Sequence, residues 1–257
     1  NIMKRIILGL LCLALWLADN DVLAQEADVR VWTGYRIQIR PTKEWRISAG
    51  QTFMFSGDPN ALSSIQNQVN ATYRINSRVR AGFGVMKSLD PDNWREGGRN
   101  RLTVRFNALA KIDGFRINNT LRAEWNSPER SKYEYRIRYA FRIYNRKWKL
   151  PLKARPFINN EFQYYLSGKL LWYRDETGER VIQQSPDGLH AHRVTLGVRF
   201  RLMKRTYMTV SCMKQTEFNL GNEYRRINVE DPRNGRIRRR FNNFSVFNFN
   251  VSHRLKF

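Results

Sequence analysis

Arginine at every second position is the feature of this sequence with the clearest chemical potential. Between residues 133 and 144, Arg136, Arg138 and Arg142 alternate with large apolar or aromatic residues. Because side chains on a β-strand point alternately to its two faces, these arginines would share one face of a strand. Rings of arginine that line a pore favour anions, so we expect an anion-attracting surface. The candidates with this spacing are Arg101, Arg105, Arg122, Arg136, Arg138, Arg142, Arg199 and Arg201.

Few carboxylates accompany these arginines. We expect Glu124, Glu134 and Glu161, which lie on the same polar faces, to be their ion-pair partners. The periodicity places about eighteen arginines on polar faces against five glutamates, which include Glu44 and Glu217. Not all of these arginines can be paired within the chain, so water or anions must solvate the remainder. Two interpretations stay open, a hydrated lumen that favours anions and an interior filled by rigid arginine–glutamate pairs.

A second arginine cluster lies in a polar segment near the end of the sequence. On the outer surface of a membrane protein, such side chains would bind phosphate groups of outer-leaflet glycolipid through bidentate hydrogen bonds. Nucleic acid would use the same charge, but the export signal described below argues against that partner. The candidates are Arg225, Arg226, Arg236, Arg238 and Arg239.

Residues suited to enzymatic chemistry are sparse. The histidines are His190, His192 and His253. His192 shares strand parity with the apolar Val194, and Ser185 is close in sequence, so a lipid-hydrolysing Ser/His pair on the outer face is one alternative. No metal-ligand spacing, phosphate loop or nucleotide fingerprint occurs. We therefore expect no cofactor and no metal, and a role that is not enzymatic.

Strands must position these side chains, because period-two alternation recurs along the chain and no helical period does. The expected strands are 29–40, 45–55, 65–75, 79–85, 99–110, 115–125, 133–144, 152–166, 193–202, 207–215 and 241–257. Short connections alternate with longer ones. The short ones lie near 76–77, 113–114, 145–149 and 203–205, and the longer ones near 87–98, 126–132, 167–189 and 218–239.

This organisation predicts an all-β fold, an antiparallel transmembrane β-barrel with short periplasmic turns and long extracellular loops. The count above is eleven strands, but bacterial single-chain barrels have even numbers, so we expect ten or twelve. Either residues 29–40 are broken or partly inside the barrel, or a long loop hides a further strand. A soluble periplasmic β-protein is the remaining alternative for the fold.

The two faces of each strand have different expected surroundings. In a closed barrel the apolar and aromatic rows meet lipid, while the arginine rows face enclosed water. Trp45, Trp125, Tyr133 and Tyr144 lie near strand ends and would form aromatic girdles at the membrane interfaces.

Residues 1–24 have the pattern of a secretory signal peptide. Met3-Lys4-Arg5 precedes an apolar run too short to span a membrane, and Ala24 is a suitable cleavage position. We expect residues 25–257 to form the barrel in the outer membrane of a Gram-negative cell. The expected partners are outer-membrane lipid, lipopolysaccharide and, during insertion, the barrel-assembly machinery, and no protein partner is indicated.

Three segments resemble a known family. They are Tyr133-Glu134-Tyr135-Arg136-Ile137-Arg138-Tyr139, Pro156-Phe157-Ile158-Asn159-Asn160-Glu161, and His192-Arg193 at the start of the strand that reaches Phe200. The chain is similar to a family of bacterial outer-membrane barrels catalogued only as a domain of unknown function. The resemblance implies a barrel and its location, and it carries no established activity and no catalytic residues. We separately expect a porin-like protein, because arginine rows would line the lumen.

Overall fold

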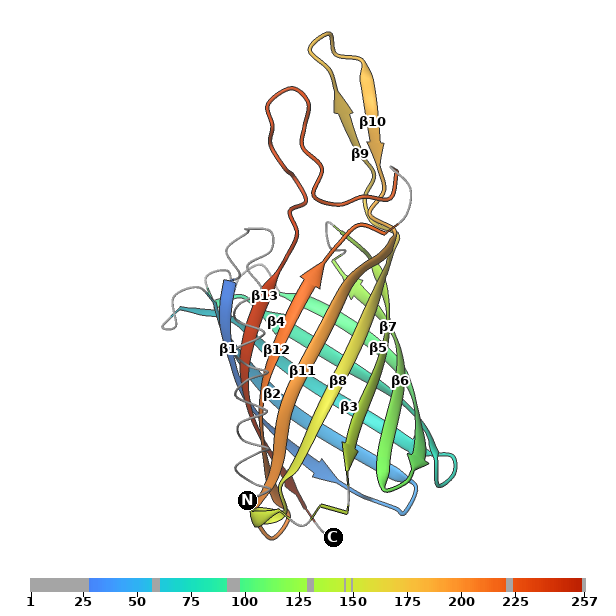
Figure 1. Cartoon of the computed structure of the whole chain (residues 1–257), viewed down its shortest axis with the longest axis vertical. Helices are drawn as coiled ribbons and strands as arrows, with labels where there is room; N and C mark the ends of the chain where they lie inside the picture. Colours follow the sequence, from blue (N-terminus) through green and yellow to red (C-terminus); the bar gives the residue numbers. More distant parts are fainter. Residues whose placement is uncertain are drawn as a thin grey trace.

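Eleven strands close into a barrel in the part of the chain that the structure describes (Figure 1). A computed structural model of the protein describes residues 28–56, 61–91, 98–128, 132–145, 147–148, 150–220 and 224–255. The barrel strands are β1 (Asp28–Ile39), β2 (Trp45–Ser56), β3 (Leu62–Arg74), β4 (Val79–Leu89), β5 (Arg99–Ile112), β6 (Phe115–Ser127), β7 (Tyr135–Asn145), β8 (Arg155–Leu166), β11 (Gly188–Met203), β12 (Thr206–Glu217) and β13 (Phe244–Arg254). A short 3-10 helix, η2 (Pro151–Lys153), precedes β8.

The barrel closes through a parallel pair. Strand β1 lies beside β13 in the same direction, from the Asp28/Phe244 pair to the Gln38/Arg254 pair, and every other neighbouring pair in the barrel is antiparallel. A ring made only of antiparallel pairs needs an even number of strands, whereas one parallel pair permits an odd number. The expectation of ten or twelve strands is therefore wrong, and β1 is one unbroken strand.

The alternation places apolar rows outside and polar rows inside, as predicted. On β7, Tyr135, Ile137 and Tyr139 are 43%, 39% and 43% exposed, whereas Arg136 and Arg138 are only 5% and 9% exposed. Similar apolar rows are exposed on β1, β3, β4, β5, β6, β8 and β13, and no second layer of the described residues covers them. The fold is thus a membrane-type β-barrel, because a soluble sandwich would bury these rows. No described helix is long and apolar enough to cross a membrane.

The connections are sorted by length between the two ends of the barrel (Figure 1). One end, here called the short-turn end, carries the tight links from β5 to β6 and from β11 to β12. The opposite, long-loop end carries the connections from β8 to β11 and from β12 to β13, which are the longest. Residues 1–27 lie outside the described part of the chain, so the signal peptide at residues 1–24 stays a prediction.

The segment predicted as a loop at residues 167–189 contains two short strands. Strands β9 (Leu171–Arg174) and β10 (Arg180–Gln184) form a separate antiparallel hairpin beyond the long-loop end (Figure 1). The hairpin does not join the barrel, so the expectation that a long loop hides a further barrel strand is wrong. The described part of the β12–β13 connection packs on it, since the hydroxyl of the buried Tyr173 donates to the carbonyl of Val229 at 3.2 Å.

Candidate anion-binding lumen

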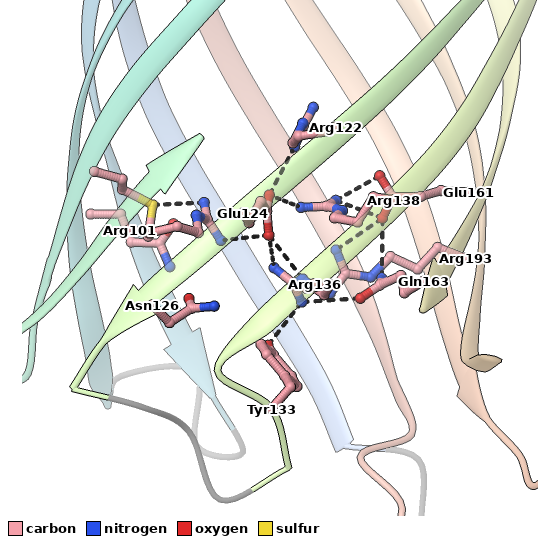
Figure 2. Close-up of polar contacts among 12 residues, drawn as sticks. Arg101, Arg122, Glu124, Asn126, Tyr133, Arg136, Arg138, Glu161, Gln163 and Arg193 are labelled. Carbon is pink, nitrogen blue, oxygen red and sulfur yellow. Dashed lines mark hydrogen bonds and ion pairs between the residues drawn. The ribbon is translucent and has the colours of Figure 1, made fainter. Parts of the chain in front are cut away.

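Glu124 is the centre of a buried ion-pair network near the long-loop end of the lumen (Figure 2). It lies near the end of β6, and the register places it opposite Arg136 at the start of β7. Arg136 donates to Glu124 from Nε at 2.8 Å and from Nη2 at 2.5 Å, and Arg138 donates from Nη1 at 3.0 Å. Glu124 is only 3% exposed. Two further cations, Arg122 at 3.5 Å and Arg101 at 3.8 Å, complete its surroundings.

Glu161 on β8 extends this network along the barrel wall toward β11. The Nη2 atom of Arg138 lies 2.5 Å and 2.6 Å from the two carboxylate oxygens of Glu161, and Nη1 of Arg193 on β11 lies 3.4 Å away. Gln163 is fully buried and joins Arg136 to Glu161. Its side chain accepts from Arg136 at 3.0 Å and donates to Glu161 at 3.1 Å. We call Glu124, Glu161, Arg136, Arg138 and Arg193 the ion-pair plug.

A second polar layer covers the plug on the side of the loops. The rings of Tyr133 and Tyr165 lie 4.5 Å apart, and the Tyr133 hydroxyl accepts from Nη1 of Arg136 at 2.9 Å. Glu217 accepts from the Tyr165 hydroxyl at 2.9 Å and pairs with Lys132 at 2.5 Å. These contacts connect the β6–β7 loop to β8 and β12 on the loop side of the plug.

Tyr133 corrects one sequence prediction. We expected it in an aromatic girdle, but it is only 5% exposed and points into the network (Figure 2). The reason is that β7 begins at Tyr135, so the alternation does not apply to Tyr133. Tyr144 also fails the prediction because it shares the inner face of β7 with Arg142, opposite Phe157. Trp45 and Trp125 do lie on the outer surface, with exposures of 40% and 39%.

Four arginines below the plug have no carboxylate partner among the described residues. Arg36, Arg105, Arg142 and Arg199 come from β1, β5, β7 and β11, and we call them the arginine belt. Arg36 is close enough to each of the other three for electrostatic repulsion, and Arg142 is repelled by Arg199 as well. The four guanidinium groups therefore lie in one region of the lumen, nearer the short turns than the plug is.

Neutral groups supply the contacts that the belt makes. Arg105 donates to the Thr72 hydroxyl at 2.8 Å, and the guanidinium of Arg142 lies 4.3 Å from the centre of the Phe157 ring. Arg199 donates to Ser252 at 3.5 Å. The buried Nε atoms of Arg36 and Arg105 have no hydrogen-bond partner among the described residues. The belt is therefore a concentration of positive charge without internal compensation.

Gly82 on β4 leaves the space that the Arg105 side chain occupies. Gly82 lies opposite both Thr72 and Arg105 in the register. A Cβ atom at Gly82 would lie only 3.1 Å from the Thr72 hydroxyl oxygen and 3.2 Å from Nε of Arg105. The small residue thus permits Arg105 to pass close to β4 and to reach Thr72.

The structure separates the predicted lumen residues into two groups. Arg101, Arg122, Arg136 and Arg138 gather around Glu124 or Glu161, whereas Arg105, Arg142 and Arg199 belong to the belt. Arg201 belongs to neither, since its Nε donates to the carbonyl of Met203 at the short-turn rim at 3.3 Å.

Glu134 does not reach the lumen. Its carboxylate accepts from the indole N–H of Trp125 at 3.0 Å, on the outer rim of the barrel. Glu134 precedes the first residue of β7, so the period-two pattern does not decide its direction. The predicted pairing of Glu134 with lumen arginines is thus not what the structure contains.

Two important lumen residues were not among the sequence candidates. Arg36 and Arg193 both follow the alternation, which could have identified them as inward-facing. The importance of Arg193 comes from its position directly opposite Glu161, and the alternation within one strand does not give that register.

The loop arginines differ in exposure. Arg225, Arg226 and Arg236 are exposed, and Arg238 pairs with Asp231 at 3.3 Å. Arg239 instead is 4% exposed and donates to the carbonyl of Lys169, and burial lowers the pKa of its guanidinium. Arg239 therefore fixes the β12–β13 connection to the β8–β11 connection and is not on the outer surface.

The described residues contain no arrangement that resembles a hydrolytic or metal centre. His192 stacks on Phe162 with ring centres 4.7 Å apart, and its Nε2 atom has no hydrogen-bond partner. The Ser185 hydroxyl accepts from the N–H of Asp187 at 3.5 Å and makes no hydrogen bond to His192. No group of three His, Cys, Asp or Glu residues in the described ranges could hold a metal ion.

Similar solved structures include two outer-membrane proteins. LpxR from Salmonella typhimurium has 13% sequence identity and a TM-score of 0.45, over 74% of this chain and 83% of its own. A NanC porin, solved in a rhombohedral crystal form, has 13% identity and a TM-score of 0.45, over 89% of this chain and 99% of its own. No curated protein matches the chain significantly. Residues 29–226 match the family described as Protein of unknown function (DUF2490), and the chain belongs to this family.

Proposed function

We propose that the protein is an outer-membrane β-barrel whose lumen takes up small anions from the periplasm. The exposed apolar rows of the barrel and the predicted signal peptide support an outer-membrane location. The sorting of connections supports an orientation with the short-turn end in the periplasm and the long-loop end outside the cell. The arginine belt then lies on the periplasmic side of the ion-pair plug.

The observation that carries this proposal is the uneven distribution of carboxylates along the lumen. Glu124, Glu161 and Glu217 all lie in the long-loop half, whereas the belt has no described carboxylate partner. Arginines that repel one another lower their electrostatic energy when an anion enters between them. Anions would therefore concentrate at the belt, and cations would be excluded from it.

The ion-pair plug limits passage beyond the belt. Its side chains come from the four neighbouring strands β6, β7, β8 and β11. Side chains also fill the interior of small barrels. We therefore propose a narrow, anion-favouring pore of low conductance, and not a wide solute channel.

Electrical recording in planar bilayers tests this function. With a KCl gradient across the bilayer, the wild-type barrel should give a small current that reverses near the chloride equilibrium potential. The variant Arg36→Gln/Arg142→Gln should lose much of this anion preference. The matched control, Arg78→Gln/Lys204→Gln, removes the same charge from exposed residues of the short turns and should keep the preference. A wild-type barrel without current, or with a preference for potassium, would contradict the proposal.

The exposed loop arginines support a second interaction with the same membrane. We propose that Arg225, Arg226, Arg236 and Arg238 contact phosphate groups of lipopolysaccharide at the outer surface. A variant with glutamine at all four positions should bind lipopolysaccharide micelles more weakly than the wild-type barrel, and equal binding would contradict this contact.

The enzymatic alternative has less support, since His192 and Ser185 make no hydrogen bond to each other.

A further inference from the structure

A small basic pocket lies at the short-turn mouth of the lumen, apart from the arginine belt. Its volume is about 50 Å³, and the residues that give it its charge are Arg40, Lys43, Glu44, Arg46, Arg74 and Arg80. A volume of about 50 Å³ holds roughly three to four waters, or one tetrahedral oxyanion. We call this cavity the turn pocket.

The first two short turns build the turn pocket. In the β1–β2 turn, the Thr42 hydroxyl accepts from the backbone N–H groups of Glu44 at 3.2 Å and Trp45 at 3.1 Å. The N–H of Arg74 donates to the Glu44 carbonyl at 3.0 Å and so joins the end of β3 to this turn. These backbone contacts fix the positions from which the basic side chains extend.

The register places the pocket on the inner face of the barrel. Arg46 lies opposite Thr72, and Thr72 lies opposite Gly82. Gly82 in turn lies opposite Arg105 of the belt, so all four positions share the lumen side. The pocket therefore opens toward the lumen mouth and not toward the hydrocarbon of the membrane.

Positive charge in the pocket exceeds the negative charge that the described residues supply there. Glu44 is its one carboxylate, and it is 3.8 Å from Arg74, with both side chains more than two fifths exposed. Exposed pairs at such distances contribute little. Arg46 is repelled by Arg40, Arg80, Arg105 and Arg254, so an anion between these side chains would relieve their repulsion.

Thr72 adds a neutral donor to this set. Its hydroxyl oxygen accepts from Arg105 at 2.8 Å, which leaves the hydroxyl hydrogen available for another acceptor. Guanidinium groups and a hydroxyl together suit an oxyanion with several acceptor oxygens, and arginine binds phosphate in bidentate geometry. We infer that the turn pocket is a binding site for a single phosphate-type oxyanion.

This inference takes one point from the proposed function, the orientation that places the short-turn end, and with it the turn pocket, on the periplasmic side of the membrane. The shared chemistry is a phosphate group, whose source is either a soluble phosphate in the periplasm or the headgroup of an inner-leaflet phospholipid. Binding at the pocket and ion passage through the lumen are measured separately, so either can fail without the other.

Titration calorimetry with inorganic phosphate tests the inference on the full barrel in maltoside micelles. The wild-type barrel should bind phosphate at one saturable site. The variant Arg46→Gln/Arg80→Gln should bind at least about tenfold more weakly, since two charged hydrogen-bond donors are lost. The control Arg78→Gln/Lys204→Gln loses the same charge at the same end, outside the pocket lining, and should bind within about twofold of the wild type.

A second variant guards against misfolding of the first. Thr72→Val keeps every charge and should still weaken phosphate binding by about threefold or more, because the hydroxyl donor is gone. Binding that is absent in the wild type, or equal in the wild type and Arg46→Gln/Arg80→Gln, would overturn the site. Equal weakening in the control would also overturn it, since binding would then follow net charge alone.

Phosphatidylglycerol in the micelles identifies the source of the phosphate group. If phosphatidylglycerol competes with inorganic phosphate in the wild type but not in Arg46→Gln/Arg80→Gln, the site is supported and its occupant is a lipid headgroup. Phosphate binding without such competition would support the site with a soluble oxyanion. A barrel that binds phosphate but passes no anion current would keep the turn pocket and lose the proposed pore.

Discussion

The two halves of the lumen carry the same kind of side chain in opposite electrostatic conditions. In the long-loop half, Arg136 and Arg138 donate short hydrogen bonds to Glu124 and Glu161. In the short-turn half, Arg142 lies two inner-face positions beyond Arg138 on the same strand but faces an aromatic ring and other arginines. The difference shows that arginines of one row can be either neutralised or left uncompensated. Carboxylates on the neighbouring strands decide which of the two applies to each arginine.

The largest expected effect is the loss of the central carboxylate. Glu124→Gln would leave several buried cations without compensation, so the free energy of unfolding should fall by about 3–5 kcal/mol. Glu134→Gln, the matched control at the outer rim, should cost less than about 1 kcal/mol. Urea unfolding in micelles, followed by the mobility of unheated samples in electrophoresis, measures both. Similar losses in the two variants would remove the distinction between plug and rim.

The same substitution on one strand sharpens the comparison. Arg138→Gln breaks contacts to two buried carboxylates and should destabilise the barrel by about 3 kcal/mol. Arg142→Gln removes one of several cations that repel one another and should change the free energy of unfolding by less than about 1 kcal/mol, in the stabilising direction. The same unfolding measurement compares the two variants. A loss of unfolding free energy in Arg142→Gln as large as in Arg138→Gln would contradict the view that only Arg138 is neutralised by carboxylates.

Salt should give the smallest effect. Added KCl screens repulsion between the belt arginines more than it weakens the short, buried pairs of the plug. The wild-type barrel should therefore gain stability with salt, by up to about 1 kcal/mol. The gain should shrink in Arg36→Gln/Arg142→Gln and persist in Arg78→Gln/Lys204→Gln. A wild-type barrel that loses stability in salt would indicate that the ion pairs dominate the whole lumen.

The sequence was sufficient to predict the barrel and the direction of most side chains. Alternation on β5, β6 and β7 identified Arg101, Arg122 and Arg136 as inward-facing, because closure fixes which face meets enclosed water. It failed at Tyr133 and Glu134, which precede β7 and so lack a strand's geometry. Its count of eleven strands was correct, and the error came from the expectation of an even number, which does not allow for the parallel β1–β13 pair.

The division between plug and belt could not be predicted from the sequence. It depends on the register between strands, which places Arg136 opposite Glu124 and Arg193 opposite Glu161. A shift of two residues between neighbouring strands would keep every side chain on its own face but would change these pairs. Residue types therefore predicted an excess of arginine, and only the assembled barrel shows where that excess lies.

Anomalous scattering from bromide in crystals of the barrel locates anions directly. Crystals soaked in bromide should give lumen peaks among Arg36, Arg105, Arg142 and Arg199, and none among the paired side chains of Glu124 and Glu161. Peaks confined to the long-loop half, or a lumen without any, would contradict the claim that uncompensated arginine charge is concentrated toward the short turns.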